Sequence, residues 1–158
     1  KEKRQKILKA LLGSMGQYSE IYPYVKFDYG CNTYLGDRCY INFNATFLDC
    51  GEIRLGSYVF LGPNVSFLTP IHPLRAEERN VRFAPDGHPY TLEACKPILV
   101  EDRVWIGGNV VILPGVTIGH DSVIGAGSVV TKNIPAGVIA VGNPCRVLRK
   151  VEESDRIK

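Results

Sequence analysis

An aliphatic residue returns at every sixth position near the end of the chain, and this spacing constrains the fold more than any other feature. The residues in phase are Ile106, Ile112, Ile118, Ile124 and Val130. A period of six fits neither the 3.6-residue repeat of a helix nor the two-residue alternation of a long strand. It indicates short extended segments separated by turns at a fixed interval. Hexapeptide repeats of this kind are typical of parallel β-helices.

The repeat extends over most of the chain. It begins at Leu35, slips by two residues after Phe47, resumes at Leu55 and stops after Phe67. Residues 68–98 lack it, and loops of this length in compact domains are usually functional or disordered. We therefore predict an all-β solenoid over residues 17–149, with a protruding loop at 68–98 and a charged tail at 150–158.

The first segment, residues 1–16, has the pattern of a short amphipathic helix. Its apolar residues recur at helical spacing, at Ile7, Leu8, Leu11 and Leu12, and its other face is basic. A basic amphipathic helix can bind a membrane surface. Repeat proteins also need their terminal coils covered, and we favour this second role, a cap on one end of the solenoid.

Composition restricts the class of protein. The 158 residues suffice for one domain with a core, and a net charge of +3 argues against a nucleic-acid partner. No apolar run approaches the roughly 18 residues of a membrane span, and no secretory signal pattern is present. The five cysteines form no CxxC pair, which favours reduced thiols in a cytoplasmic protein.

Several segments resemble the maltose/galactoside O-acetyltransferase family, and the resemblance covers about residues 4–150. They are FDYGCNTYLGDRCYINFNATFLD, the loop segment TPIHPL, and the runs VWIGGNVVILPGVTIG and VIGAGSVVTKNIPAGVIAVGNPCRV. The resemblance implies a left-handed parallel β-helix with three hexads in each coil. It also implies a homotrimer with active sites at subunit interfaces. The implied activity is transfer of an acetyl group from acetyl-CoA to a hydroxyl of a sugar, with no metal required.

The predicted catalytic residue is His72, in the long loop between Pro70 and Pro73. Its unperturbed pKa near 6.5 suits proton transfer at neutral pH. We expect it to act as general base toward the acceptor hydroxyl in a direct transfer. None of the cysteines carries the signature of an acyl-enzyme nucleophile.

The resemblance also implies contacts to both substrates. Acceptor contacts are expected at Asp28, Asn42 and Asp49. Contacts to acetyl-CoA are expected at Asn42, Trp105, Gly108, Ala126, Thr131, Lys132, Arg146 and Arg149. The chemistry agrees, because carboxylates accept hydrogen bonds from sugar hydroxyls and cations pair with phosphates. A backbone N–H, here that of Gly108, can stabilise the oxyanion of a tetrahedral intermediate.

The identity of the acceptor stays open. In the galactoside members the second acid aligns with Cys50 and not with Asp49, which favours a maltose- or glucose-like acceptor. A galactoside, a chitooligosaccharide or another hydroxyl compound are the alternatives. We expect residues 75–96 to form one wall of the acceptor cleft.

Two other classes of function share this solenoid. Carbonic anhydrases of the γ type bind zinc through three histidines, and this chain has three, His72, His88 and His120. Their H-x4-H pair is absent from the sequence, which disfavours zinc. A solenoid without catalysis, built only for interaction, is the remaining alternative.

Overall fold

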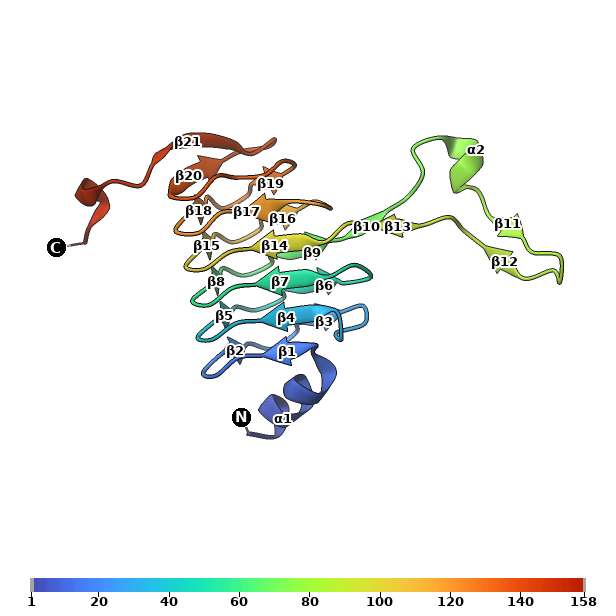
Figure 1. Ribbon diagram of the computed structural model, residues 1–158, viewed down its shortest axis with the longest axis horizontal. Coiled ribbons are helices and arrows are strands. Elements are labelled where there is room, and N and C mark those ends of the chain that lie inside the picture. Colours follow the sequence, from blue (N-terminus) through green and yellow to red (C-terminus); the bar gives the residue numbers. More distant parts are fainter. Residues whose placement is uncertain (1, 158) are drawn as a thin grey trace.

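The six-residue repeat folds into short strands that stack in three sheets around one core, parallel throughout except for the last strand of sheet B (Figure 1). The structure is a computed structural model that describes residues 2–157. Sheet A contains β1 (Ser14–Met15), β4 (Thr33–Leu35), β7 (Ile53–Leu55), β14 (Ile98–Val100) and β17 (Thr117–Ile118). Sheet B contains β2 (Glu20–Ile21), β5 (Tyr40–Ile41), β8 (Phe60–Leu61), β15 (Trp105–Ile106), β18 (Val123–Ile124), β20 (Val138–Val141) and β21 (Arg146–Lys150). Sheet C contains β3 (Lys26–Phe27), β6 (Thr46–Leu48), β9 (Ser66–Leu68), β16 (Val111–Ile112) and β19 (Val129–Val130). The predicted β-helix is confirmed.

The in-phase aliphatic residues point into the core, as the repeat predicts. Ile106, Ile112 and Ile118 are each 0% exposed. On the early coils of sheet C the core column is aromatic, and the rings of Phe47 and Phe67 stack with centroids 5.0 Å apart. Burial of such side chains contributes about 1.5–3 kcal/mol each.

Glycine follows many of these aliphatic residues because adjacent coils approach each other closely there. A Cβ on Gly62 would lie 2.5 Å from the nitrogen of Gly108, and one on Gly107 would lie 2.6 Å from the nitrogen of Ala126. Neither glycine has a positive φ. Of the two reasons for glycine, close approach and a left-handed backbone, the first therefore applies at these positions.

Left-handed residues lie at the tips of the turns on this side of the solenoid. Asn44, Asn64 and Asn109 have φ values of 60°, 59° and 58°, and the last two lie two positions after Gly62 and Gly107. Asparagine tolerates this region better than most residues. Here the amides also form a ladder from coil to coil, with hydrogen bonds of 3.1 Å and 3.0 Å.

The two-residue slip in the repeat corresponds to a longer coil in the first part of the solenoid. Partners on sheet A lie 20 residues apart from Ser14 to Tyr34 and from Tyr34 to Arg54, but 18 apart from Leu99 to Thr117. The extra residues lie where sheet C leads into sheet A. The long loop leaves from this same corner, which we call the C–A corner.

The long loop is an ordered arm that projects from the solenoid (Figure 1). At its base, β10 (Pro70–Ile71) pairs antiparallel with β13 (Ala94–Cys95). Farther out lie α2 (Ala76–Arg79) and a hairpin of β11 (Arg82–Phe83) and β12 (Pro89–Tyr90). The arm therefore holds its end residues away from the chain's own coils.

Helix α1 (Glu2–Leu11) lies against the first coil (Figure 1). Leu8 and Leu12 are buried in the common core, as expected for a cap. Within residues 2–157, no helix has the length and hydrophobicity to cross a membrane.

The last coil is covered by β21, which turns back antiparallel to β20. The short 3-10 helix η1 (Glu153–Asp155) follows. It lies in the segment predicted as a charged tail.

Candidate active site

An open groove of about 480 Å³ lies along sheet B. It is lined by Tyr40, Asn42, Phe60, Leu61, Gly62 and Trp105. The structure thus brings two of the expected site residues, Asn42 and Trp105, into one groove. The indole is 55% exposed, so an aromatic surface is available to a ligand.

Sequence reasoning missed the two other aromatic residues of this groove. Tyr40 pairs with Phe60, and Phe60 pairs with Trp105, at successive coils of sheet B. Each directly precedes an inward aliphatic residue. Alignment of the hexads one below another would have revealed this aromatic column.

The corner after these strands, where sheet B leads into sheet C, holds further predicted residues. Because Leu61, Ile106 and Ile124 are partners in register, the residues that follow them also stack. Gly108 and Ala126 thus lie on adjacent coils of this B–C corner. Within residues 2–157 the N–H of Gly108 donates to no protein acceptor.

Asn42 is the first residue of the same corner on an earlier coil. It is half-buried, and its Oδ1 accepts a hydrogen bond of 2.8 Å from the backbone N–H of Phe43. This bond fixes the orientation of the carboxamide beside the groove.

His72 directly follows β10 near the base of the arm, and its side chain is exposed. Arg79 stabilises the backbone beside it. Its Nη1 donates hydrogen bonds of 2.9 Å to the carbonyl of Pro73 and 3.2 Å to that of Leu74. Sequence reasoning missed Arg79, because this contact depends on how α2 folds back over the segment.

His72 and Asn42 belong to different corners of the solenoid. Each strand of sheet C begins at the B–C corner, where Asn42 lies, and ends at the C–A corner, from which the arm leaves. Asp28, exposed, follows β3 at the C–A corner. One chain alone therefore places the histidine and the groove on separate edges.

Asp49 has a structural environment that differs from the expected one. It is 0% exposed, and its Oδ1 accepts hydrogen bonds from the N–H groups of Tyr29 (2.9 Å) and Gly30 (3.1 Å). Its Oδ2 accepts one of 2.9 Å from the Thr33 hydroxyl. The carboxylate accepts hydrogen bonds from donors in the turn of the preceding coil. For this reason we leave Asp49 out of the acceptor site.

The residues expected to contact the phosphates of CoA lie toward the last coils. Thr131 and Lys132 are exposed after β19, and Arg146 donates 2.9 Å to the carbonyl of Cys145. Arg149 is already paired, because its two terminal nitrogens each lie 2.7 Å from a carboxylate oxygen of Asp155.

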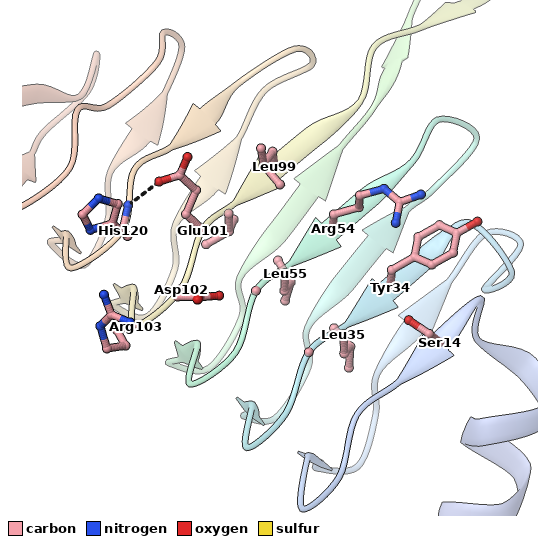
Figure 2. A pocket seen from close by; sticks show the side chains of 13 residues that line it. Ser14, Tyr34, Leu35, Arg54, Leu55, Leu99, Glu101, Asp102, Arg103 and His120 are labelled. Atoms are coloured by element: carbon pink, nitrogen blue, oxygen red, sulfur yellow. Dashed lines mark hydrogen bonds between the residues drawn. The ribbon is translucent and has the colours of Figure 1, made fainter.

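A second groove, of about 580 Å³, runs over sheet A (Figure 2). The guanidinium of Arg54 lies 4.0 Å from the ring centroid of Tyr34 there and pairs with Glu52. None of the residues expected to bind substrate lines it. It is therefore a less suitable candidate than the groove on sheet B.

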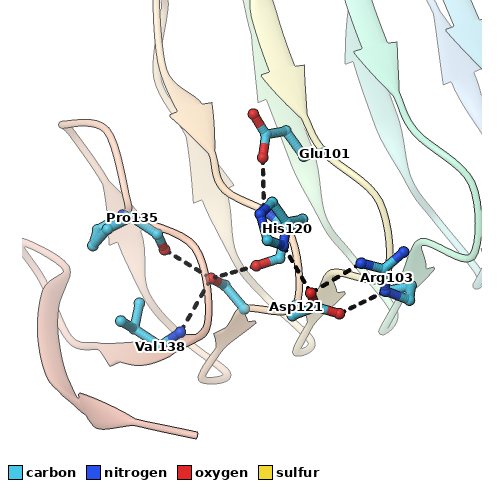
Figure 3. Close-up of polar contacts among 7 residues, drawn as sticks. Glu101, Arg103, His120, Asp121, Pro135 and Val138 are labelled. Atoms are coloured by element: carbon cyan, nitrogen blue, oxygen red, sulfur yellow. Dashed lines mark hydrogen bonds and ion pairs between the residues drawn. The ribbon is translucent and has the colours of Figure 1, made fainter.

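His120 lies at one end of the second groove, in a surface cluster of charges (Figure 3). Its Nδ1 is 2.7 Å from Asp121 Oδ2, and Arg103 pairs with the same carboxylate at 2.6 Å. Hydrogen bonds from Arg103 and then from His120 lower the pKa of Asp121. Over the described part of the chain, no three His, Cys, Asp or Glu side chains are grouped to hold a metal ion.

Comparison with known proteins agrees with this geometry. The family described as "Bacterial transferase hexapeptide (six repeats)" matches residues 97–132. The galactoside O-acetyltransferase of Escherichia coli (strain K12) is 42% identical over 98% of this chain and 72% of its own length. A crystal structure of a maltose O-acetyltransferase from Clostridium difficile 630 superposes with a TM-score of 0.88 at 46% identity, over 96% of this chain and 76% of that one. A galactoside acetyltransferase in complex with coenzyme A also gives 0.88, at 41% identity over 98% of this chain and 72% of its own.

Proposed function

This chain belongs to the maltose/galactoside O-acetyltransferase family of hexapeptide-repeat enzymes, and we propose that it moves an acetyl group from acetyl-CoA to a sugar hydroxyl with His72 as general base. The observation that supports this most directly is the groove on sheet B beside the free N–H of Gly108. An acetyl thioester needs an apolar surface and a donor for its carbonyl oxygen.

The donor substrate is assigned to the groove and the corner beyond it. Trp105 and Asn42 flank the thioester, and Gly108 donates to its oxygen as negative charge develops. Ala126 leaves room for the pantetheine arm. Four residues toward the last coils bind the polar part of CoA through its phosphates, as cations and hydroxyls do. They are Thr131, Lys132, Arg146 and Arg149.

The reaction is a direct transfer. Neutral His72 accepts the proton of the acceptor hydroxyl while its oxygen attacks the thioester carbon. The tetrahedral intermediate collapses with loss of the C–S bond, and the imidazolium returns the proton to the thiolate. The products are an acetyl ester and free CoA, and the enzyme is unchanged.

Assembly as a homotrimer would complete the site. Within one chain, His72 is on the arm at the C–A corner and the groove ends at the B–C corner. An arm that projects from the solenoid can reach the groove of a neighbouring copy (Figure 1). The active site then lies between subunits, and an isolated chain is inactive.

The acceptor is assigned to the side of the arm. Asp28 is exposed at the C–A corner and can accept hydrogen bonds from sugar hydroxyls. Residues 75–96 would form one wall of the cleft. A maltose- or glucose-like sugar is the favoured acceptor, because the galactoside members have an acid at the position of Cys50.

The test is release of CoA thiol from acetyl-CoA with a panel of maltose, glucose, galactosides and chitooligosaccharides. We expect His72→Ala to lower turnover by at least about 10²-fold, the usual contribution of a general base. His88→Ala is the matched control, because His88 is also an exposed histidine of the arm. Activity retained in His72→Ala, or lost equally in His88→Ala, would refute the assignment.

A further inference from the structure

Three side chains meet at the base of the arm. Cys50 lies in the turn after β6, Thr69 joins β9 to β10, and Cys95 lies in β13. In sequence, Cys50 precedes the arm and Cys95 lies near its end. In space, they come from the solenoid and from the returning strand of the arm.

The contacts bring the two thiols together. Cys50 Sγ is 3.4 Å from Thr69 Oγ1, and the same hydroxyl accepts a hydrogen bond of 2.9 Å from the N–H of Gly51. A Cβ added to Gly51 would lie 3.1 Å from Cys95 Cβ and 3.2 Å from its Sγ. Burial raises the pKa of the Cys50 thiol, and the neighbouring thiol of Cys95 contributes further.

The pairing of strands holds this arrangement in place. Cys95 is the partner of Pro70 in the β10–β13 ladder, and the N–H of Lys96 donates 3.1 Å to the carbonyl of Thr69. Thr69 itself is 0% exposed. The two cysteines therefore lie beside the same fixed junction, Cys50 against Thr69 and Cys95 against Gly51.

We propose that Cys50 and Cys95 are a dithiol that exchanges with a low-molecular-weight disulfide, such as oxidised glutathione, and closes a disulfide across the base of the arm. Cys95 is the more exposed of the two and reacts first. Its thiolate attacks one sulfur of the reagent, which forms a mixed disulfide and releases one glutathione thiolate.

The thiolate of Cys50 then attacks Cys95 Sγ and displaces the second glutathione. Overall, two protein thiols are oxidised, one glutathione disulfide is reduced to two thiols, and the two protons pass to the leaving thiolates. The disulfide attaches the arm, which carries His72, to the solenoid. Reducing conditions release it.

The other cysteines provide internal controls. Cys39 and Cys145 are buried, whereas Cys31 is exposed in the turn after β3. An exposed cysteine alone would form a mixed disulfide with glutathione. Only a facing pair resolves it to a protein disulfide.

The experiment uses limited trypsin digestion after exposure to oxidised glutathione. Arg75, Arg79 and Arg82 lie in the arm between the two cysteines. Cleavage there divides the chain into fragments that each carry one thiol of the pair. On a non-reducing denaturing gel the oxidised fragments stay joined, and they separate with dithiothreitol. Mass spectrometry finds the peptide that links Cys50 to Cys95.

Two variants decide the outcome. Cys95→Ser abolishes the joined species, whereas Cys31→Ser leaves its yield unchanged. Fragments that separate without reductant, a stable glutathione adduct on Cys95, or a link through Cys31 would each overturn the proposal. The readout is a covalent bond and needs no acetyl transfer, so it stands or fails apart from the proposed activity.

Discussion

Arg149 holds Asp155 through two parallel hydrogen bonds, from Nη1 to Oδ2 and from Nη2 to Oδ1, each of 2.7 Å. The backbone N–H of Glu152 donates a third bond of 2.9 Å to this carboxylate. Two-pronged pairing of this kind is also how arginine binds phosphate. The tail of the chain thus occupies a guanidinium that the proposed function assigns to CoA.

Asp155→Asn should therefore strengthen acetyl-CoA binding. An exposed ion pair contributes little, so we expect the Michaelis constant for acetyl-CoA to fall only by about 1.5- to 5-fold with turnover unchanged. Steady-state kinetics with varied acetyl-CoA measures this. Glu153→Gln is the matched control, because Glu153 pairs with Arg156 instead. An unchanged constant in Asp155→Asn would remove Arg149 from the CoA site.

The same pair makes docking of the tail dependent on pH. Arg149, and then the N–H of Glu152, lower the pKa of Asp155 from 3.8 to about 2. The ionised carboxylate of Asp155 therefore contributes its full stabilisation of the docked tail above about pH 4. This stabilisation is lost as the pH falls through about 2. The NMR chemical shift of the Asp155 carboxyl carbon should titrate with a midpoint of about 2. In Arg149→Ala the midpoint should return toward 3.8; a wild-type midpoint already there would contradict the pairing.

Arg79 should act as a positioning residue for His72. Arg79→Ala removes the hydrogen bonds to the carbonyls of Pro73 and Leu74, so the histidine samples more orientations. We expect turnover to fall by about 10-fold, which corresponds to the loss of about 1.4 kcal/mol, with the Michaelis constant for acetyl-CoA unchanged. Arg75→Ala is the control, because Arg75 pairs only with Glu77 among the described residues. A rise in the Michaelis constant with constant turnover would argue against positioning.

Trp105 should report occupancy of the groove directly. It is the only tryptophan in the sequence and is 55% exposed, so its fluorescence arises from one site. Titration with CoA should change its intensity or emission maximum in a saturable way. Lys132→Ala should move the midpoint to higher CoA concentration without changing the amplitude, since Lys132 lies outside the groove. A flat titration of the wild-type protein would place CoA elsewhere.

The fold was predictable because its signal is local. The spacing of Ile106, Ile112 and Ile118 alone decides which side chains face inward, whatever the neighbouring coil contains. The arm was likewise visible as a break in the spacing. Its ordered strands were not, because β10 and β13 pair across more than 20 intervening residues.

The site was predictable only in part. Asp28 and Asp49 are both acids at the C–A corner, and the sequence does not distinguish them. Only the stacked coils show that Asp49 meets the N–H groups of the turn before it, while Asp28 stays exposed. The aromatic column of Tyr40 and Phe60 depends in the same way on the number of residues in each coil.

By itself, the sequence determined the solenoid, the place of the arm and the family, since a six-residue period and its flanking motifs are properties of neighbouring residues. The tertiary structure decided which polar groups are already satisfied and which remain free. Asp49 and Arg149 are paired within the chain, while the N–H of Gly108 is not. Hydrogen bonding between coils depends on contacts between residues distant in sequence, and for this reason only the folded chain reveals it.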